Sequence, residues 1–239
     1  MNRPYIICHM LTTLDGKISG PAFGSPEAAA LAGHYHLQGG RHHLREDHGG
    51  GGVHQGEAAR AVLPPGGPPA REDHIAAPDA AQYLIAVDPA GELGWTGSVV
   101  QGRGPSYDGA HIITVLREDV SDRYLAYLRK LGISYLFGGR HALCFSDVCV
   151  KLHAHFGIRR VLLQGGELLN GSFAAEDLID ELSLLIAPAA DCGSGQPSLF
   201  EEMPGLSVSP RRFVRKDIQV LEHSGLALQY VRDREEEAN

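Results

Sequence analysis

The sequence predicts an α/β fold in which a mixed, mostly parallel sheet has helices on both faces. Three observations lead to this prediction. Short apolar segments alternate with segments of helical spacing, two of the four helical segments end at glycine, and the last two apolar segments flank a turn. The chain of 239 residues is also long enough to bury a substantial core.

The individual elements follow from the same patterns. Ser25 and Pro26 suit the N-cap and first position of a helix, whereas Gly132 and Gly157 suit the C-terminal ends of two others. We expect a single domain over 1–232 and a charged tail at 233–239. Strands are predicted at 4–11, 83–87, 111–116, 133–137, 160–163, 182–187, 214–221 and 227–231, and helices at 25–36, 121–131, 146–156 and 167–178.

The composition argues against several classes of protein. The chain has 21 Lys and Arg against 29 Asp and Glu, and its net charge of −8 argues against nucleic acid or an anionic membrane as a partner. No apolar run approaches the ~20 residues of a membrane-spanning helix. The N-terminus does not have the features of a signal peptide. Four cysteines are too few for a disulfide framework. We therefore predict a cytoplasmic protein that acts on a small molecule.

A glycine pair after a predicted strand is the first candidate binding site. Gly165 and Gly166 lie between the strand at 160–163 and a helix, where free backbone N–H groups and a positive helix end can bind a phosphate. Glycine also lets a ligand approach the backbone closely. An ordinary strand–helix turn has the same pattern, so both interpretations stay open. The segment does not match the dinucleotide fingerprint of a standard Rossmann domain.

Polar residues at the end of the first strand form a second candidate site. Thr12, Thr13 and Asp15 follow the strand at 4–11, where open α/β sheets bind their ligands. Asp15 could orient a substrate or merely close the turn with Gly16. A histidine-rich stretch suggests metal binding, but its spacing matches no zinc pattern and there is no paired Cys motif. We therefore predict no metal site and keep a histidine-rich metal binder as an alternative.

Five motifs occur in order along the chain: Arg3-Pro4-Tyr5 leading to Leu14-Asp15-Gly16-Lys17-Ile18, Leu162-Leu163-Gln164-Gly165-Gly166, Leu169-Asn170-Gly171-Ser172-Phe173, Leu178-Ile179-Asp180-Glu181-Leu182 and Ile186-Ala187-Pro188. These motifs resemble those of the riboflavin-biosynthesis pyrimidine reductases, whose C-terminal reductase domain has a dihydrofolate reductase-like fold. The resemblance implies NADPH-dependent hydride transfer to a small heterocyclic substrate, as in 5-amino-6-(5-phosphoribosylamino)uracil reductase, by a homodimer. The alternative is a non-catalytic nucleotide-binding protein or inactive relative on the same fold.

The resemblance also implies roles for individual residues. Asp15 and Gln164 would be catalytic and would bind substrate together with Thr13. Gln164 stands where many members of the family have Glu, which leaves the substrate open. Cofactor contacts are expected at Thr12, Pro89, Gly165, Gly166, Glu167, Leu168, Leu169 and Asn170.

Residues 39–70 are anomalous. They are rich in Gly, Pro and His and have no apolar periodicity, so we expect no regular structure there. The family would place its second core strand and a Gly-Arg-x-Thr turn here. We hypothesise a frame-shifted translation, because a one-base shift after Gln38 forces His42 and His43 to become Ile or Thr. The alternative is a genuine low-complexity insertion, which would remove a core strand and part of the cofactor site.

Overall fold

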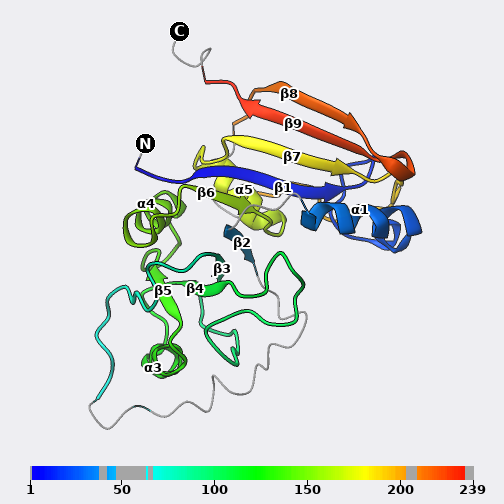
Figure 1. The fold of residues 1–239 in the computed structure, drawn as a ribbon. Coiled ribbons are helices and arrows are strands. Elements are labelled where there is room, and N and C mark those ends of the chain that lie inside the picture. Colours follow the sequence, from blue (N-terminus) through cyan, green and yellow to red (C-terminus); the bar gives the residue numbers. More distant parts are fainter. Residues whose placement is uncertain (1, 38–41, 47–62, 64–66, 203–208, 235–239) are drawn as a thin grey trace. The chain divides into compact units, whose positions relative to one another are not determined.

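The computed structural model describes residues 2–37, 42–46, 63, 67–202 and 209–234. The chain divides into two compact units. The central unit contains residues 41–159 together with 1–4, and the terminal unit contains residues 5–40 and 160–239. Figure 1 shows the strands and helices coloured along the sequence.

Four parallel strands form the sheet of the central unit, in the order β5-β4-β3-β2. Strands β3 and β4 are buried along their whole length, as expected for parallel strands covered on both faces. The elements of this unit are β2 (His42–Glu46), β3 (Tyr83–Val87), β4 (His111–Leu116), α3 (Asp122–Leu131), β5 (Ser134–Phe137) and α4 (Phe145–Phe156).

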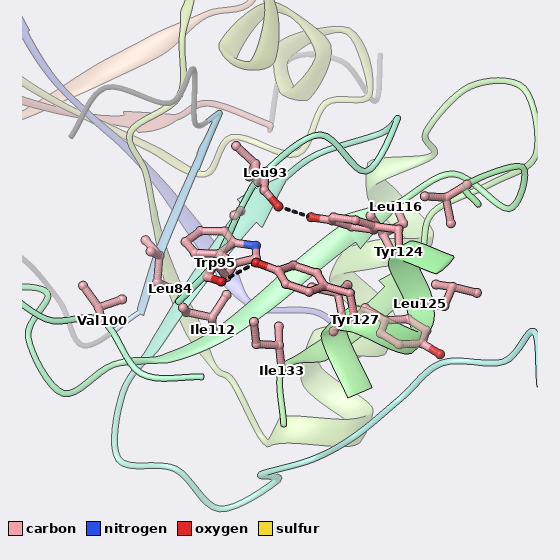
Figure 2. Packing of buried hydrophobic residues seen from close by; sticks show 14 of the residues in the cluster. Leu84, Leu93, Trp95, Val100, Ile112, Leu116, Tyr124, Leu125, Tyr127 and Ile133 are labelled. Atoms are coloured by element: carbon pink, nitrogen blue, oxygen red, sulfur yellow. Dashed lines mark hydrogen bonds between the residues drawn. The ribbon is translucent and has the colours of Figure 1, made fainter. Parts of the chain in front are cut away.

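Helices α3 and α4 cover opposite faces of this sheet. Tyr124 of α3 belongs to a buried cluster with Leu84 of β3 and Ile112 of β4, which Figure 2 shows from close by. The neighbouring Tyr83 contacts Phe156 of α4, with ring centroids 5.2 Å apart. Successive side chains of a strand point to opposite faces of a sheet. Helix α3 therefore covers the face of Leu84, and helix α4 covers the face of Tyr83.

Strand β2 forms where the sequence shows no strand pattern. It pairs in parallel with β3 over its whole length, from His42 beside Tyr83 to Glu46 beside Val87. Leu44 is fully buried, and the His43 ring lies 4.6 Å from the ring of Tyr107. The expectation of no regular structure at 39–70 is therefore wrong for 42–46.

The physical reason is that backbone pairing and the burial of one leucine and one ring compensate for the missing alternation of apolar residues. Most of the remaining anomalous segment lies outside the described residues. The frame-shift interpretation accordingly stays a hypothesis.

The outer edge of β5 is covered by the segment 73–76. His74 and Tyr135 each donate their N–H to the other's carbonyl oxygen, both at 2.9 Å. The N–H of Phe137 donates to Asp73 Oδ1 at 2.8 Å. Backbone groups that an edge strand would otherwise expose are thus bound within the chain.

Five strands form the sheet of the terminal unit, in the order β6-β1-β7-β9-β8. Strands β6, β1 and β7 are parallel, and β9 is antiparallel to both β7 and β8. The elements are β1 (Tyr5–Thr12), η1 (Pro21–Gly24), α1 (Pro26–Leu37), β6 (Arg160–Leu163), α5 (Glu167–Ala175), β7 (Glu181–Ile186), β8 (Phe213–Val220), η2 (Glu222–Ser224) and β9 (Leu226–Arg232).

Helices α1 and α5 also cover opposite faces of their sheet. Leu31 of α1 packs against Leu11, whose face also includes Ala227 by strand register. Ala174 of α5 and Arg232 of β9 line the same cavity, which has a volume of about 360 Å³. Arg232 is an odd number of residues from Ala227 on the same strand, so it lies on the opposite face of the sheet. Helix α5 therefore covers that opposite face. The predicted mixed, mostly parallel sheet with helices on both faces is confirmed: the strands of the central unit are all parallel, and the antiparallel pairs lie in the terminal unit.

Candidate functional site

The carboxyl ends of three parallel strands lie at one edge of the terminal unit. Strand β6 ends at Leu163, which is in register with Cys8 of β1. Strand β1 continues four residues further to Thr12, beside Ile186 of β7. Thr12 therefore extends about 13 Å further along the sheet than Leu163. The predicted ligand-binding segments at 12–15 and 165–166 therefore follow strands at the same edge of the sheet, but they begin at different positions along the strand direction.

Asp15 binds the backbone of a segment that follows β7. Thr13 Oγ1 donates to Asp15 Oδ1 at 2.5 Å. The N–H groups of Asp191 and Cys192 donate to Oδ1 at 3.2 Å and Oδ2 at 3.1 Å. The Thr13 hydroxyl, followed by the backbone N–H groups, lowers the pKa of Asp15 below its ordinary value. Asp15 is exposed, so the carboxylate is accessible from solvent.

The turn after β1 holds the same segment at further points. The N–H of Leu14 donates to the carbonyl oxygen of Ala189 at 2.8 Å, and the N–H of Ile18 donates to that of Pro197 at 3.2 Å. We call residues 189–201 the strap. Its first part lies against the turn after β1, where Thr12 and Thr13 are buried.

The far end of the strap lies against the first turns of α5. The N–H of Glu201 donates to the carbonyl oxygen of Glu167 at 3.1 Å, and Asn170 Nδ2 donates to that of Leu199 at 3.0 Å. A Cβ on Gly171 would lie 1.9 Å from the carbonyl oxygen of Glu201. Close approach of the two backbones therefore requires glycine at position 171.

Gly165 and Gly166 lead from β6 into α5. A Cβ on Gly165 would lie 2.8 Å from the side chain of Leu169, so close packing requires glycine here. Gly166 is the N-cap residue and has extended backbone angles, and no side chain in the described part of the chain caps the helix. The N–H groups of the first turn, from Glu167 and Leu168 onward, can therefore bind an anionic ligand.

Asn170 is the most buried polar residue of this helix start. Its side chain is fully buried, and Nδ2 binds the strap. Its Oδ1 has no hydrogen-bond partner among the described residues. A buried amide oxygen without a donor is costly, so this atom is a place where a water molecule or a ligand donor would be stabilised. Gln164, which precedes the glycine pair, is partly buried.

Pro89 lies in the central unit and follows β3. Its carbonyl oxygen accepts a hydrogen bond from the N–H of Arg117 at 3.1 Å. The preceding Asp88 is buried and accepts from the N–H of Leu93 at 3.0 Å and from the hydroxyl of Tyr124 at 2.6 Å. Burial, followed by the charge of Asp88, raises the pKa of Tyr124. These contacts fix the turn that contains Pro89.

The sequence analysis missed the strap and its contribution to the candidate site. Asp191 binds Asp15 through its N–H, and its own Oδ1 accepts from the N–H of Ala22 at 3.2 Å. Lys17 Nζ donates to the carbonyl oxygen of Gln196 at 3.0 Å. The only available signal was a stretch rich in glycine and proline after a strand, which indicates a loop but not what the loop contacts.

Within the described ranges, His, Cys, Asp and Glu side chains form no group of three that could bind a metal ion. His48 and His54 of the anomalous segment lie outside these ranges. In the same ranges no helix has both the length and the apolar character needed to cross a bilayer.

Comparisons with known proteins agree with this architecture. Residues 109–222 match the model of the RibD C-terminal domain, a range that includes Gln164–Asn170 but neither Thr12–Asp15 nor Pro89. No curated protein matches the chain.

Three similar solved structures share the fold at low sequence identity. RibD of Acinetobacter baumannii is 18% identical with a TM-score of 0.60, over 98% of this chain but 59% of that one, so this chain spans about three fifths of that protein. A pyrimidine reductase-like protein from Corynebacterium diphtheriae is 17% identical with a TM-score of 0.63, over 98% and 94%. The riboflavin biosynthesis reductase Rib7 of Saccharomyces cerevisiae is 14% identical with a TM-score of 0.57, over 98% and 91%.

These relatives are riboflavin-biosynthesis proteins or pyrimidine reductase-like proteins, and the dihydrofolate reductase-like fold that the motifs implied is confirmed. Residues 109–222, a little under half of the chain, are therefore similar to the RibD C-terminal domain, and the chain shares the fold of RibD and of a pyrimidine reductase-like protein.

Proposed function

We propose that the protein is an NADPH-dependent reductase that transfers a hydride to a small heterocyclic substrate, as in riboflavin biosynthesis. The family match supports a reductase of this pathway. The observation that carries the cofactor assignment is the uncapped start of α5 directly after Gly165 and Gly166, at the carboxyl edge of a parallel sheet. This is the position at which open α/β sheets bind nucleotide phosphates.

The helix start fits a phosphate group of a dinucleotide. The backbone N–H groups of Glu167 and Leu168 would donate to the phosphate oxygens, and the helix dipole would favour their charge. Glu167 itself adds a negative charge to the first turn. We therefore propose that its side chain turns toward solvent when the phosphate binds. Thr12 would contact the cofactor from the end of β1.

The substrate side of the proposed site has neutral polar groups. NADPH would supply a hydride from its nicotinamide ring. The role of the protein is then to hold the acceptor carbon in position and to exclude water. The amide of Gln164 can donate to and accept from a heterocycle, whereas it cannot transfer a proton as a carboxylate would. Thr13 is the second proposed substrate contact. Pro89, in the central unit, is a further proposed cofactor contact.

We also propose that the protein is a cytoplasmic homodimer with no nucleic-acid partner. Strand β8 lies at the edge of the terminal sheet and exposes Val214, Ile218 and Val220. The strand register puts Ile218 and Val220 on one face and Gln219 on the other. Sedimentation equilibrium should show that Ile218→Lys weakens self-association, whereas the matched control Gln219→Lys leaves it unchanged.

A thermal-shift titration with NADPH and NADH tests the proposed function. We expect a saturable rise in melting temperature that is larger with NADPH. Gly166→Val should abolish this rise without lowering the melting temperature of the free protein, because the backbone angles of Gly166, φ −75° and ψ 177°, suit any residue. Gly24→Val is the matched control, since a Cβ there meets no atom within 4 Å.

The outcomes separate the two hypotheses. NADPH oxidation coupled to reduction of a pyrimidine substrate would support the reductase. Saturable binding without turnover would favour the non-catalytic relative. A stable protein that binds neither nucleotide would contradict the reductase and favour an inactive relative on the same fold.

A further inference from the structure

The strap connects the two segments to which we assign ligand binding. At residues 191–192 it is bound by Asp15, in the turn after β1. At residues 199–201 it is bound by Asn170 and Glu167, in the first turns of α5. Its position at α5 is therefore linked by hydrogen bonds to the turn that contains Asp15.

We propose that Asp15 is a positioning residue that fixes the strap and, through it, the start of α5. This role differs from direct contact with substrate, and it rests on the proposed function only for the identity of the ligand at α5. Asp15 supplies both carboxylate oxygens to two successive backbone N–H groups of the strap. A carboxylate is an effective acceptor for such a pair, because charge-assisted hydrogen bonds are the stronger kind.

The conformation of the strap at this point needs external support. Cys192 has a φ of +55°, a left-handed conformation that is unfavourable for residues other than glycine. The N–H of Cys192 is one of the two groups that Asp15 binds. Asp191 in turn binds the segment that follows this turn, since its Oδ1 accepts from the N–H of Ala22 in η1, and a Cβ on Gly20 would lie 2.8 Å from the same oxygen. Two carboxylates thus bind the two segments reciprocally.

The Thr13 hydroxyl extends this effect along the strap. Thr13 Oγ1 donates to Asp15 and accepts from the N–H of Lys17 at 3.0 Å. The next residue, Ile18, holds the strap at Pro197. Removing the Asp15 carboxylate therefore loosens the first contact directly and weakens the second through Thr13. The strap segment that contacts α5 begins two residues later, at Leu199.

Hydrogen exchange of the ligand-free protein tests the proposal. In Asp15→Ala, amide exchange should accelerate at least about tenfold at Asp191 and Cys192, and also at Glu201, whose N–H binds α5. Asp15→Asn preserves the shape of the side chain but replaces one acceptor by a donor, so it should show the same pattern. The control is Glu27→Gln, which removes an exposed carboxylate on α1. Faster exchange confined to 191–192 would overturn the proposal.

NADPH affinity gives a second, independent measurement. A raised Kd for NADPH in Asp15→Asn, with circular dichroism unchanged, supports positioning of the α5 start. An unchanged Kd alongside faster exchange at Glu201 would show that the strap does not control the ligand site, and would overturn the proposal. If the unmodified protein binds no NADPH, the proposed function fails, and exchange at Glu201 alone decides whether Asp15 fixes the strap.

Discussion

Two aspartates follow parallel strands, and their surroundings differ. Asp88 is buried and accepts hydrogen bonds from Glu92 N–H at 2.8 Å, from Leu93 N–H and from the Tyr124 hydroxyl. Leu93 and Tyr124 belong to the buried cluster of the central unit, which Figure 2 shows. Asp15 also accepts from two backbone N–H groups and one hydroxyl, but its backbone partners lie more than 170 residues away and it is exposed. The same bonding chemistry fixes a local turn in one case and joins distant segments in the other.

Asp88→Ala should have the largest effect on stability. The substitution leaves the N–H groups of Glu92 and Leu93 without their acceptor, and the Tyr124 hydroxyl keeps only its bond to the carbonyl oxygen of Leu93, at 2.9 Å. We expect the free energy of unfolding to fall by about 3–5 kcal/mol, measured by urea denaturation at pH 7. Asp15→Ala, measured in the same way, should lower the free energy of unfolding by less. Equal losses in the two variants would contradict the distinction between the two aspartates.

Gly171→Ala should disrupt the contact between the strap and α5. The added Cβ would meet the carbonyl oxygen of Glu201, so the strap must move away from the helix. We expect a loss of about 1–3 kcal/mol in urea denaturation, typical of overpacking. Hydrogen exchange at Glu201 should rise with it. Gly24→Ala serves as the control, and an equal loss there would exclude a strap effect.

Acid should weaken the central unit before it affects Asp15. Burial, followed by the charge of His74, lowers the pKa of His111, and burial followed by Arg129 lowers that of His74. The folded state then binds fewer protons than the unfolded state, so the free energy of unfolding falls as the pH drops below about 6.5. The stabilisation from Asp15, whose pKa is lowered, is lost only as the pH falls below its ordinary value of 3.8.

The variant His111→Gln tests whether His111 causes the loss of stability in the upper of these two pH ranges. Gln can still form a hydrogen bond with Ser134 Oγ, which lies 2.9 Å from His111 Nε2, but it does not titrate. The decrease in the urea midpoint between pH 7 and pH 5 should be smaller in this variant. An unchanged decrease would assign the acid sensitivity to other histidines.

Cys192→Gly should have the smallest effect. Glycine relieves the left-handed conformation, worth about 1 kcal/mol, but it also increases the entropy of the unfolded chain by a similar amount. We expect the thermal midpoint to change by no more than about 2 °C. A large stabilisation would show that Asp15 holds Cys192 against considerable strain.

Local patterns predicted most of the fold. The strands at 83–87, 111–116 and 160–163 have the predicted bounds, and Gly132 caps the C-terminal end of α3 as expected. These elements follow from apolar periodicity and capping, which depend on neighbouring residues. Strand β2 could not be predicted, because its pairing with β3 is decided by tertiary context.

The candidate site was predictable only in part. The sequence identified Asp15 and the glycine pair at 165–166 as polar or phosphate-binding features at strand ends. It did not reveal that Asp15 binds Asp191 and Cys192, because hydrogen bonds between segments so distant in sequence leave no local pattern. Gly171 shows the same limit, since its requirement for glycine comes from the strap and not from the helix that contains it.

The covered edge of β5 also affects how the chain would aggregate. The bridge between His74 and Tyr135 occupies backbone groups to which a strand of another molecule would otherwise add. Proteolytic cleavage near residue 73 would release this cover while leaving the strands β3 to β5 paired with one another. Fibril seeding would then begin at β5, before any loss of secondary structure.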